Sequence, residues 1–267
     1  MTELKKNAVY PVRIFSEAWG VFRKNVVRLC SIYFIFYVPY LLLSVLANVL
    51  PGDQSNILLI IIAFVSIWCS VALLFAVNKA TDQESFSIKE SIMLGMKKYS
   101  LNYVGIILLL FLFGLLILLA MLAAFYVASL LLKVSSILAI VLQILCVVLG
   151  VCLVVYFMIR WSLGWVCILE NINPFAALKR SRVLIKGHVN PVVGEYALFI
   201  MASIVANIPY LILTLIFTSP DANQEIQILG AAINSVVVYG IVSPFVVTIM
   251  VVLYKKLKEV NAINVHP

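Results

Sequence analysis

Six long runs of apolar residues determine what this chain can fold into. They cover residues 29–50, 57–77, 104–132, 137–159, 192–217 and 228–254. Each run is long enough to cross the roughly 30 Å hydrocarbon core of a bilayer as an α-helix, which takes about 20 residues. The runs are continuous and do not alternate with period two, which excludes the strands of a membrane barrel. The sequence therefore predicts an all-α integral membrane protein with six transmembrane helices.

The composition supports the same class. Hydrophobic residues make up 64% of the 267 residues and charged residues only 11%, whereas a soluble domain is about one quarter charged. No stretch outside the apolar runs is long enough to form a core of its own, so we expect a single membrane domain over residues 1–267. The first run follows a basic segment and precedes no small-residue cleavage site, which argues against a cleaved signal peptide.

The distribution of Lys and Arg predicts the orientation. Six of these cations precede the first run, four lie between the second and third, four besides Arg160 lie between the fourth and fifth, and three follow the sixth. The loops on the other side contain only Lys133. Because cytoplasmic loops carry the excess of positive charge, we expect both termini of this multi-pass protein on the cytoplasmic side of the membrane.

Three basic segments each precede an odd-numbered run: "YPVRIFSEAWGVFRKNVVRL", "SFSIKESIMLGMKKYSLNYV" and "NPFAALKRSRVLIKGH". Each carries a signal for the start of a helix. Pro11 suits a first-turn position, Ser87 and Glu90 have the spacing of a capping box, and Asn173 followed by Pro174 is a typical N-cap pair.

The apolar residues of these segments recur at helical spacing, as Ile14, Ala18 and Phe22 do, with cations between them. This pattern is typical of helices that lie in the membrane interface. We expect three amphipathic surface helices on the cytoplasmic face, the third ending at Gly187. The cations predicted to contact lipid headgroups are Arg13, Arg23, Lys24, Lys97, Lys98, Lys179, Arg180, Arg182 and Lys186.

These segments also suggest an internal threefold repeat of a surface helix plus a transmembrane hairpin, over residues 10–77, 86–169 and 173–257. "VPYLLLSVL" at 38–46 resembles "IPYLILTLI" at 208–216. Because every unit would cross twice and return to the cytoplasm, the copies would be parallel. The alternative, that hydrophobic spans resemble one another in any membrane protein, stays open.

The stretch "RWSLGWVCILENINPFAALKRSRVLIKGH", residues 160–188, resembles poorly characterised bacterial six-span inner-membrane proteins. These are related to the membrane domain found with glycerophosphoryl diester phosphodiesterases. Trp165 stands where those proteins often have proline. The resemblance implies the architecture and a bacterial inner membrane, but not the phosphodiesterase reaction, whose separate barrel needs His and several carboxylates. The positions that match are Arg160, Glu170, Ala177, Leu178, Ser181, Leu184 and Gly187.

Two charged residues lie within or directly beside the apolar runs, where charge is costly. Arg160 comes directly after the fourth run and Glu195 near the start of the fifth. We expect them to pair across adjacent helices, with Glu170 as a rival partner for Arg160. Either this is a structural ion pair, or it is a site for an anion or a lipid headgroup.

Proline also interrupts three of the runs. Pro39, Pro209 and Pro244 each free backbone carbonyls, which could line a cavity together with Asn207 and Asn234. The alternative is simple helix kinks with interhelical hydrogen bonds.

No catalytic or metal-binding motif is present in the sequence, so we expect neither an enzyme nor a cofactor or metal. The cations occur beside apolar runs, which favours anionic phospholipid headgroups or a membrane-protein partner over nucleic acid. We expect an accessory or lipid-interacting module. The alternatives are a permease-like transporter of a lipid or other hydrophobic molecule, and self-protection against a membrane-active peptide.

Overall fold

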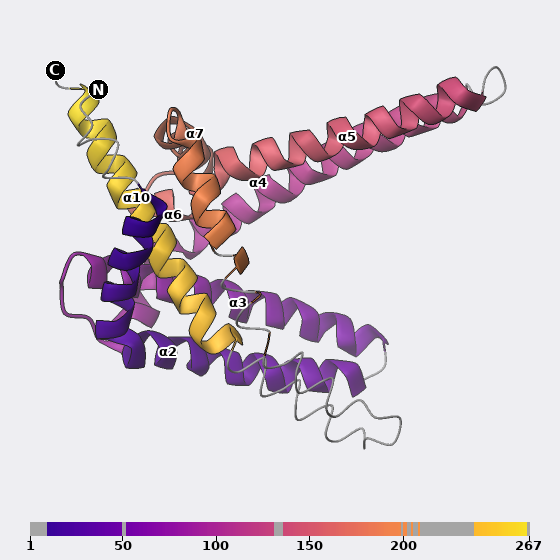
Figure 1. Cartoon of the computed structure of the whole chain (residues 1–267). Coiled ribbons are helices and arrows are strands. Elements are labelled where there is room, and N and C mark those ends of the chain that lie inside the picture. Colours follow the sequence, from indigo (N-terminus) through magenta and orange to yellow (C-terminus); the bar gives the residue numbers. More distant parts are fainter. Residues whose placement is uncertain are drawn as a thin grey trace. The chain divides into compact units, whose positions relative to one another are not determined.

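The computed structural model describes residues 10–49, 52–130, 136–198, 200–201, 204, 208 and 238–265. The described residues contain helices and no strand. The helices labelled in Figure 1 are α2 (Pro11–Val49), α3 (Gly52–Thr81), α4 (Ile88–Leu130), α5 (Ser136–Trp161), α6 (Gly164–Cys167), α7 (Pro174–Ile185) and α10 (Ser243–Val265). Two short elements complete them, the 3-10 helix η2 (Ile168–Glu170) and the π-helix η3 (Val238–Val242).

Five helical segments among the described residues are long and apolar enough to cross a membrane. They are Pro11–Leu43, Asn56–Thr81, Ile88–Leu130, Ile140–Glu170 and Gly240–Ala262. They correspond to five of the six predicted spans, and the protein is a multi-pass membrane protein by this criterion. The other predicted span, residues 192–217, falls largely outside the described residues.

Two of the three predicted surface helices are not separate elements, which corrects the sequence-based prediction. Helix α2 continues from the basic segment through the first span for 39 residues, and α4 does the same for 43 residues. At 1.5 Å per residue these helices are about 58 and 65 Å long, roughly twice the thickness of the hydrocarbon core. The physical reason is that the first junction contains no glycine or proline, and the single glycine at the second, Gly105, lies inside a helix that continues on both sides of it. The surface segments are therefore extensions of the spanning helices.

The third surface helix is separate, as predicted. Helix α7 begins with Pro174 behind the N-cap Asn173, whose side-chain oxygen accepts a hydrogen bond of 2.8 Å from the Ala176 amide. It ends at Ile185, and Gly187, two residues further on, has a φ of +85°, a conformation that costs glycine little. The predicted start of α4 is also confirmed, because the Glu90 amide donates to Ser87 Oγ at 3.1 Å.

The chain divides into two compact units, and their positions relative to one another are not determined (Figure 1). Unit 1 contains residues 1–100 and 187–267, and unit 2 contains residues 101–186. These boundaries differ from those of the predicted repeat, which stays a prediction.

In unit 1, α2 and α3 form a hairpin and α10 packs against both helices (Figure 1). The ring of Phe245 on α10 lies 5.2 Å from that of Phe15 and 5.3 Å from that of Phe22, both on α2. The first turns of α4 join this core at Gly95, where a Cβ atom would lie only 3.0 Å from the carbonyl oxygen of Val71. Close approach of this kind requires a residue without a side chain.

In unit 2, the remainder of α4 pairs with α5. Phe113 on α4 lies 4.6 Å from the ring of Trp161 on α5, and Gly150 on α5 faces the Met121 side chain. Most of the other large apolar side chains of the two helices are exposed. Because exposed apolar surface on this scale is unfavourable in water, lipid is the solvent that these helices suit.

Candidate functional sites: cationic helices and a tyrosine-lined cavity

Helix α7 buries one apolar face and carries its cations on the other, which also holds the exposed side chains of Phe175 and Val183. Ala177, Leu178, Ser181, Leu184 and Ile185 are all buried. Lys179, Arg182 and Lys186 are exposed. The predicted amphipathic pattern of this segment is therefore confirmed.

Buried contacts attach α7 to the end of α5. The hydroxyl of Ser181 donates to the Arg160 carbonyl at 2.9 Å and accepts from the Leu163 amide at 3.2 Å. Gly164 lies against Leu178, whose Cδ2 would be only 2.7 Å from a Cβ atom at that glycine. These contacts hold α7 in one rotational orientation and so keep its cations on the outer face.

The fourth cation of this segment has a different environment. Arg180 Nε lies 3.4 Å from a carboxylate oxygen of Glu170, close enough for an ion pair, but the geometry is not that of a hydrogen bond. Arg180 therefore contributes to local structure, and it is a less suitable headgroup contact than its three exposed neighbours. The expected pairing of Glu170 with Arg160 stays a prediction.

Arg160 and Glu195 belong to different units of the chain. In unit 2, the Arg160 guanidinium lies over the Tyr156 ring, 5.3 Å from its centroid, in a cation–π contact. In unit 1, the Glu195 side chain is fully buried, and neither carboxylate oxygen has a hydrogen-bond partner among the described residues. A pairing of Arg160 with Glu195 would join the two units and stays a prediction.

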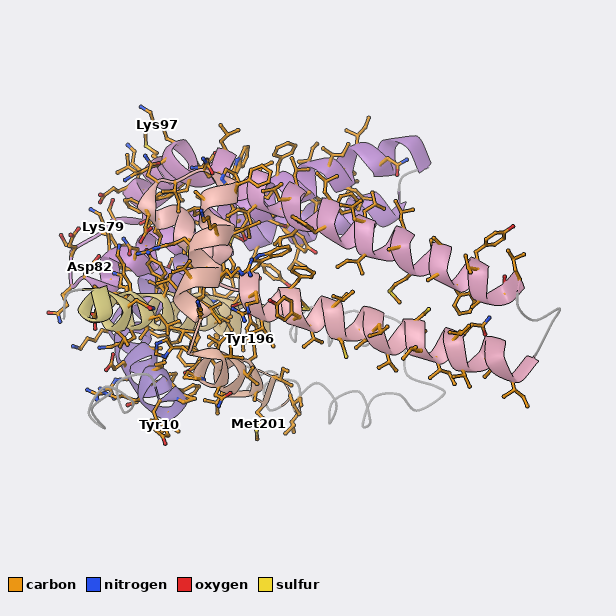
Figure 2. All side chains as sticks on the ribbon, turned by 90° about the horizontal axis from the view of Figure 1, so that it is seen from above. Tyr10, Lys79, Asp82, Lys97, Tyr196 and Met201 are labelled. Atoms are coloured by element: carbon orange, nitrogen blue, oxygen red, sulfur yellow. The ribbon has the colours of Figure 1, made fainter. Side chains whose placement is uncertain are left out.

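The other predicted headgroup contacts belong to unit 1. Arg13, Arg23 and Lys24 are exposed on α2, and Lys97 and Lys98 are exposed on α4. Arg13 forms an exposed ion pair of 3.4 Å with Glu17, and Lys98 lies over the ring of Tyr99. Figure 2 shows Lys79, Asp82 and Lys97 toward one end of this unit.

A network of ion pairs joins the N-terminal part of α2, the C-terminal end of α3 and helix α10. It was not predicted from the sequence. Lys255 Nζ lies 2.8 Å from Asp82 and donates to the Asn78 carbonyl at 2.9 Å. Lys256 lies 3.2 Å from Glu17. A hollow of about 360 Å³ is lined in part by these side chains. Because the cations and carboxylates there are already paired with one another, we assign the network to holding the three helices together.

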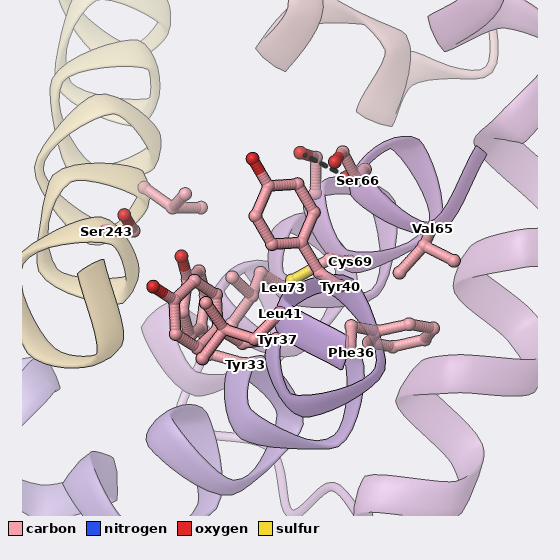
Figure 3. Close-up of a pocket in the computed structure, with 12 residues that line it drawn as sticks. Tyr33, Phe36, Tyr37, Tyr40, Leu41, Val65, Ser66, Cys69, Leu73 and Ser243 are labelled. Carbon is pink, nitrogen blue, oxygen red and sulfur yellow. Dashed lines mark hydrogen bonds between the residues drawn. The ribbon is translucent and has the colours of Figure 1, made fainter. Parts of the chain in front are cut away.

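Further along unit 1, the same three helices line a partly open cavity of about 420 Å³ (Figure 3). Its described lining carries hydroxyl groups on all three helices and no charged side chain. The polar lining residues are Tyr33, Tyr37, Tyr40, Ser66, Ser70 and Ser243, and the others are Phe36, Leu41, Val65, Cys69, Leu73 and Val247.

The rings of the three lining tyrosines stack on one another along α2. The ring of Tyr37 lies 5.2 Å from that of Tyr33 and 5.8 Å from that of Tyr40, both in stacked orientation. Their spacing of i, i+4 and i+7 places them on one helix face. This spacing is visible in the sequence and could have predicted the wall, although not the cavity behind it.

The predicted proline sites have different outcomes. Helix α2 continues through Pro39, which is exposed and does not line the cavity but lies between two residues that do. Pro244 is buried in the first turn of α10, directly after η3 and next to the lining residue Ser243. Asn207, Pro209 and Asn234 lie outside the described residues.

The described residues contain no group of three or more His, Cys, Asp or Glu side chains that could hold a metal ion. No family model, curated protein or solved structure matches the chain. The resemblance in residues 160–188 therefore stays a prediction.

Proposed function

We propose that this protein is a non-enzymatic multi-pass protein of the bacterial cytoplasmic membrane that binds anionic phospholipid headgroups on its cytoplasmic face. The observation that carries the proposal is helix α7, whose apolar side is buried while Lys179, Arg182 and Lys186 project from the opposite side. Cations held at a membrane surface attract anionic lipid, by about 1 kcal/mol for each Lys or Arg near the surface.

The exposed cations of unit 1 support the same function. Arg23 and Lys24 lie on the part of α2 that precedes the first predicted span, and Lys97 and Lys98 lie on the part of α4 that precedes the third. Both helices are too long for the hydrocarbon core alone. Their cationic ends are therefore suited to the headgroup layer, where the aliphatic stems of Lys and Arg can stay in contact with apolar surface.

The test replaces Lys179, Arg182 and Lys186 together with glutamine and leaves Arg180 in place, because Arg180 is paired with Glu170. Phosphatidylglycerol and phosphatidylethanolamine retained by the purified protein are then quantified by mass spectrometry. Three charges at about 1 kcal/mol each set an upper limit of roughly 100-fold on the loss of preference for the anionic lipid. We expect a loss of at least tenfold, and a smaller one in high salt.

The matched control keeps every charge: Lys179→Arg, Arg182→Lys and Lys186→Arg in one chain. If the attraction is electrostatic, this variant retains the anionic lipid as the wild type does. Unchanged lipid retention in the glutamine variant, or an equal loss in the charge-preserving variant, would refute headgroup binding by α7.

The second candidate function is permease-like handling of a lipid or other hydrophobic molecule. The observation that favours it is the tyrosine-lined cavity, since a transporter of this class needs an internal site at membrane depth. It predicts that filling the cavity changes the movement of the molecule between leaflets, which the glutamine variant of α7 would not do.

A further inference from the structure

The cavity between α2, α3 and α10 lies within the predicted hydrocarbon layer. Tyr33 and Tyr40 come 4 and 11 residues after the start of the first predicted span, which places them roughly 6 and 16 Å below its cytoplasmic boundary. The centre of the layer is about 15 Å deep. A molecule in this cavity would therefore reach it from the membrane and must be soluble in lipid.

The lining determines the chemistry of such a molecule. Six side chains carry hydroxyl groups. Those of Ser66 and Ser70 already donate to the carbonyls of Ile62 and Ser66, each at 3.0 Å, and can still accept a hydrogen bond. No described lining residue is charged. Because an ion without a counter-charge is costly at this depth, the cavity disfavours carboxylates, phosphates and amines. The other walls are apolar side chains such as Phe36 and Leu41, which suit a hydrocarbon chain.

The backbone beside the cavity has an irregularity of the kind that often marks a functional site. The π-helix η3 ends at Val242, immediately before the lining residue Ser243. Single π-turns are rare and are concentrated at functional sites. Within η3, Gly240 lies against the ring of Phe34, whose Cζ would be 2.6 Å from a Cβ atom there. In Figure 3 the hydroxyl ends of Tyr33 and Tyr37 point to the side of the cavity on which Ser243 lies.

We propose that this cavity binds an uncharged long-chain lipid whose polar end is a hydroxyl or carbonyl group. The polar end is held among the tyrosine and serine hydroxyls, and the chain runs along the apolar walls. A volume of about 420 Å³ is within the range of small-molecule sites, about 300–1,000 Å³. This site is independent of headgroup binding, because no cation of the surface helices lines the cavity.

The experiment compares two photoreactive probes in native membranes: a long-chain alcohol that carries a diazirine, and a carboxylate of the same chain at pH 8. Crosslinked positions are mapped by mass spectrometry. The readout is the ratio of crosslinks on residues 33–41 and 65–73 to crosslinks on the exposed faces of α4 and α5, which corrects for different partitioning of the probes into lipid. We expect this ratio to be at least fivefold higher for the alcohol.

A pair of variants on α3 tests the location. Cys69 lines the cavity, and Cys69→Phe should fill it and lower the ratio for the alcohol at least fivefold. Ile61 is on the same helix with an exposed side chain, and Ile61→Phe should leave the ratio unchanged. The glutamine variant of α7 should also leave it unchanged, so a failure of headgroup binding would be distinguishable from a failure of this site.

Equal ratios for the alcohol and the carboxylate would overturn the proposal, and this comparison needs only the wild-type protein. An unchanged ratio in folded Cys69→Phe would do so as well. Rapid reaction of Cys69 with a small charged thiol reagent, in a chain whose other cysteines are replaced by alanine, would show that the cavity holds water instead of lipid.

Discussion

Removing the hydroxyl of Ser181 is a small change that should lower the stability of the protein substantially. It donates to the Arg160 carbonyl and accepts from the Leu163 amide, and both Ser181 and Leu163 are fully buried. Ser181→Ala removes both hydrogen bonds and adds no atoms. The Leu163 amide is left without its partner in a buried position, which costs about 1–3 kcal/mol. Since the hydrogen bond to the Arg160 carbonyl is lost as well, we expect the free energy of unfolding to fall by roughly 2–3 kcal/mol.

The neighbouring serine provides the control. Ser162 is also buried, but its hydroxyl has no hydrogen-bond partner among the described residues. Ser162→Ala should therefore be neutral or slightly stabilising. Apparent melting temperatures of the purified variants in one detergent measure the difference. At about 2–4 °C per kcal/mol, Ser181→Ala should melt roughly 4–12 °C lower and Ser162→Ala within about 1 °C of the wild type.

Ser181→Ala should also reduce the retention of anionic lipid, although it removes no charge, because α7 would lose the contacts that keep its cations on the outer face. Similar melting temperatures for the two alanine variants would refute this account of how α7 is attached. A lowered melting temperature with unchanged lipid retention would refute the link between attachment and headgroup binding.

Two further predictions concern unit 1. Lys255→Met removes both the Asp82 ion pair and the hydrogen bond to the Asn78 carbonyl, and it should lower the free energy of unfolding by about 1–2 kcal/mol. Asp82→Asn should lower it by less than about 1 kcal/mol, because this half-exposed carboxylate is screened by solvent and Lys255 keeps its other bond. Equal losses in melting temperature would contradict this difference. Burial lowers the pKa of His188, so the unfolded chain takes up the proton first as the pH falls below its ordinary value of about 6.5. The melting temperature should therefore fall between pH 7.5 and 5.5 more in the wild type than in His188→Gln, and a smaller fall in the wild type would count against the burial of this imidazole.

The features of the fold that were predictable from the sequence are those encoded locally. Apolar runs of sufficient length predicted the spanning helices, and the caps at Ser87, Asn173 and Gly187 predicted where helices begin or end. The continuity of α2 and α4 was missed because a helix needs no signal to continue, only the absence of a signal to stop. The change of composition from basic to apolar was interpreted as a break between two elements, although no proline accompanies it and the one glycine there, Gly105, is part of α4.

The sites that were not predicted depend on contacts between distant segments. Lys255 and Asp82 are far apart in the sequence, and no pattern in either segment indicates the other. The cavity likewise requires α2, α3 and α10 to pack together. Its tyrosine wall was visible as an i, i+4, i+7 spacing, but aromatic residues at that spacing are more often part of a core. The cationic faces were predicted because amphipathic periodicity is itself a local property.

The side of the membrane on which α7 lies tests the central claim most directly, since headgroup binding on the cytoplasmic face requires it. A single cysteine is introduced as Lys179→Cys in a chain whose five native cysteines are replaced by alanine, and a membrane-impermeant maleimide is added to intact cells or to inside-out vesicles. We expect labelling in the inside-out vesicles and none in intact cells. Labelling of intact cells would place α7 on the opposite face and contradict the account.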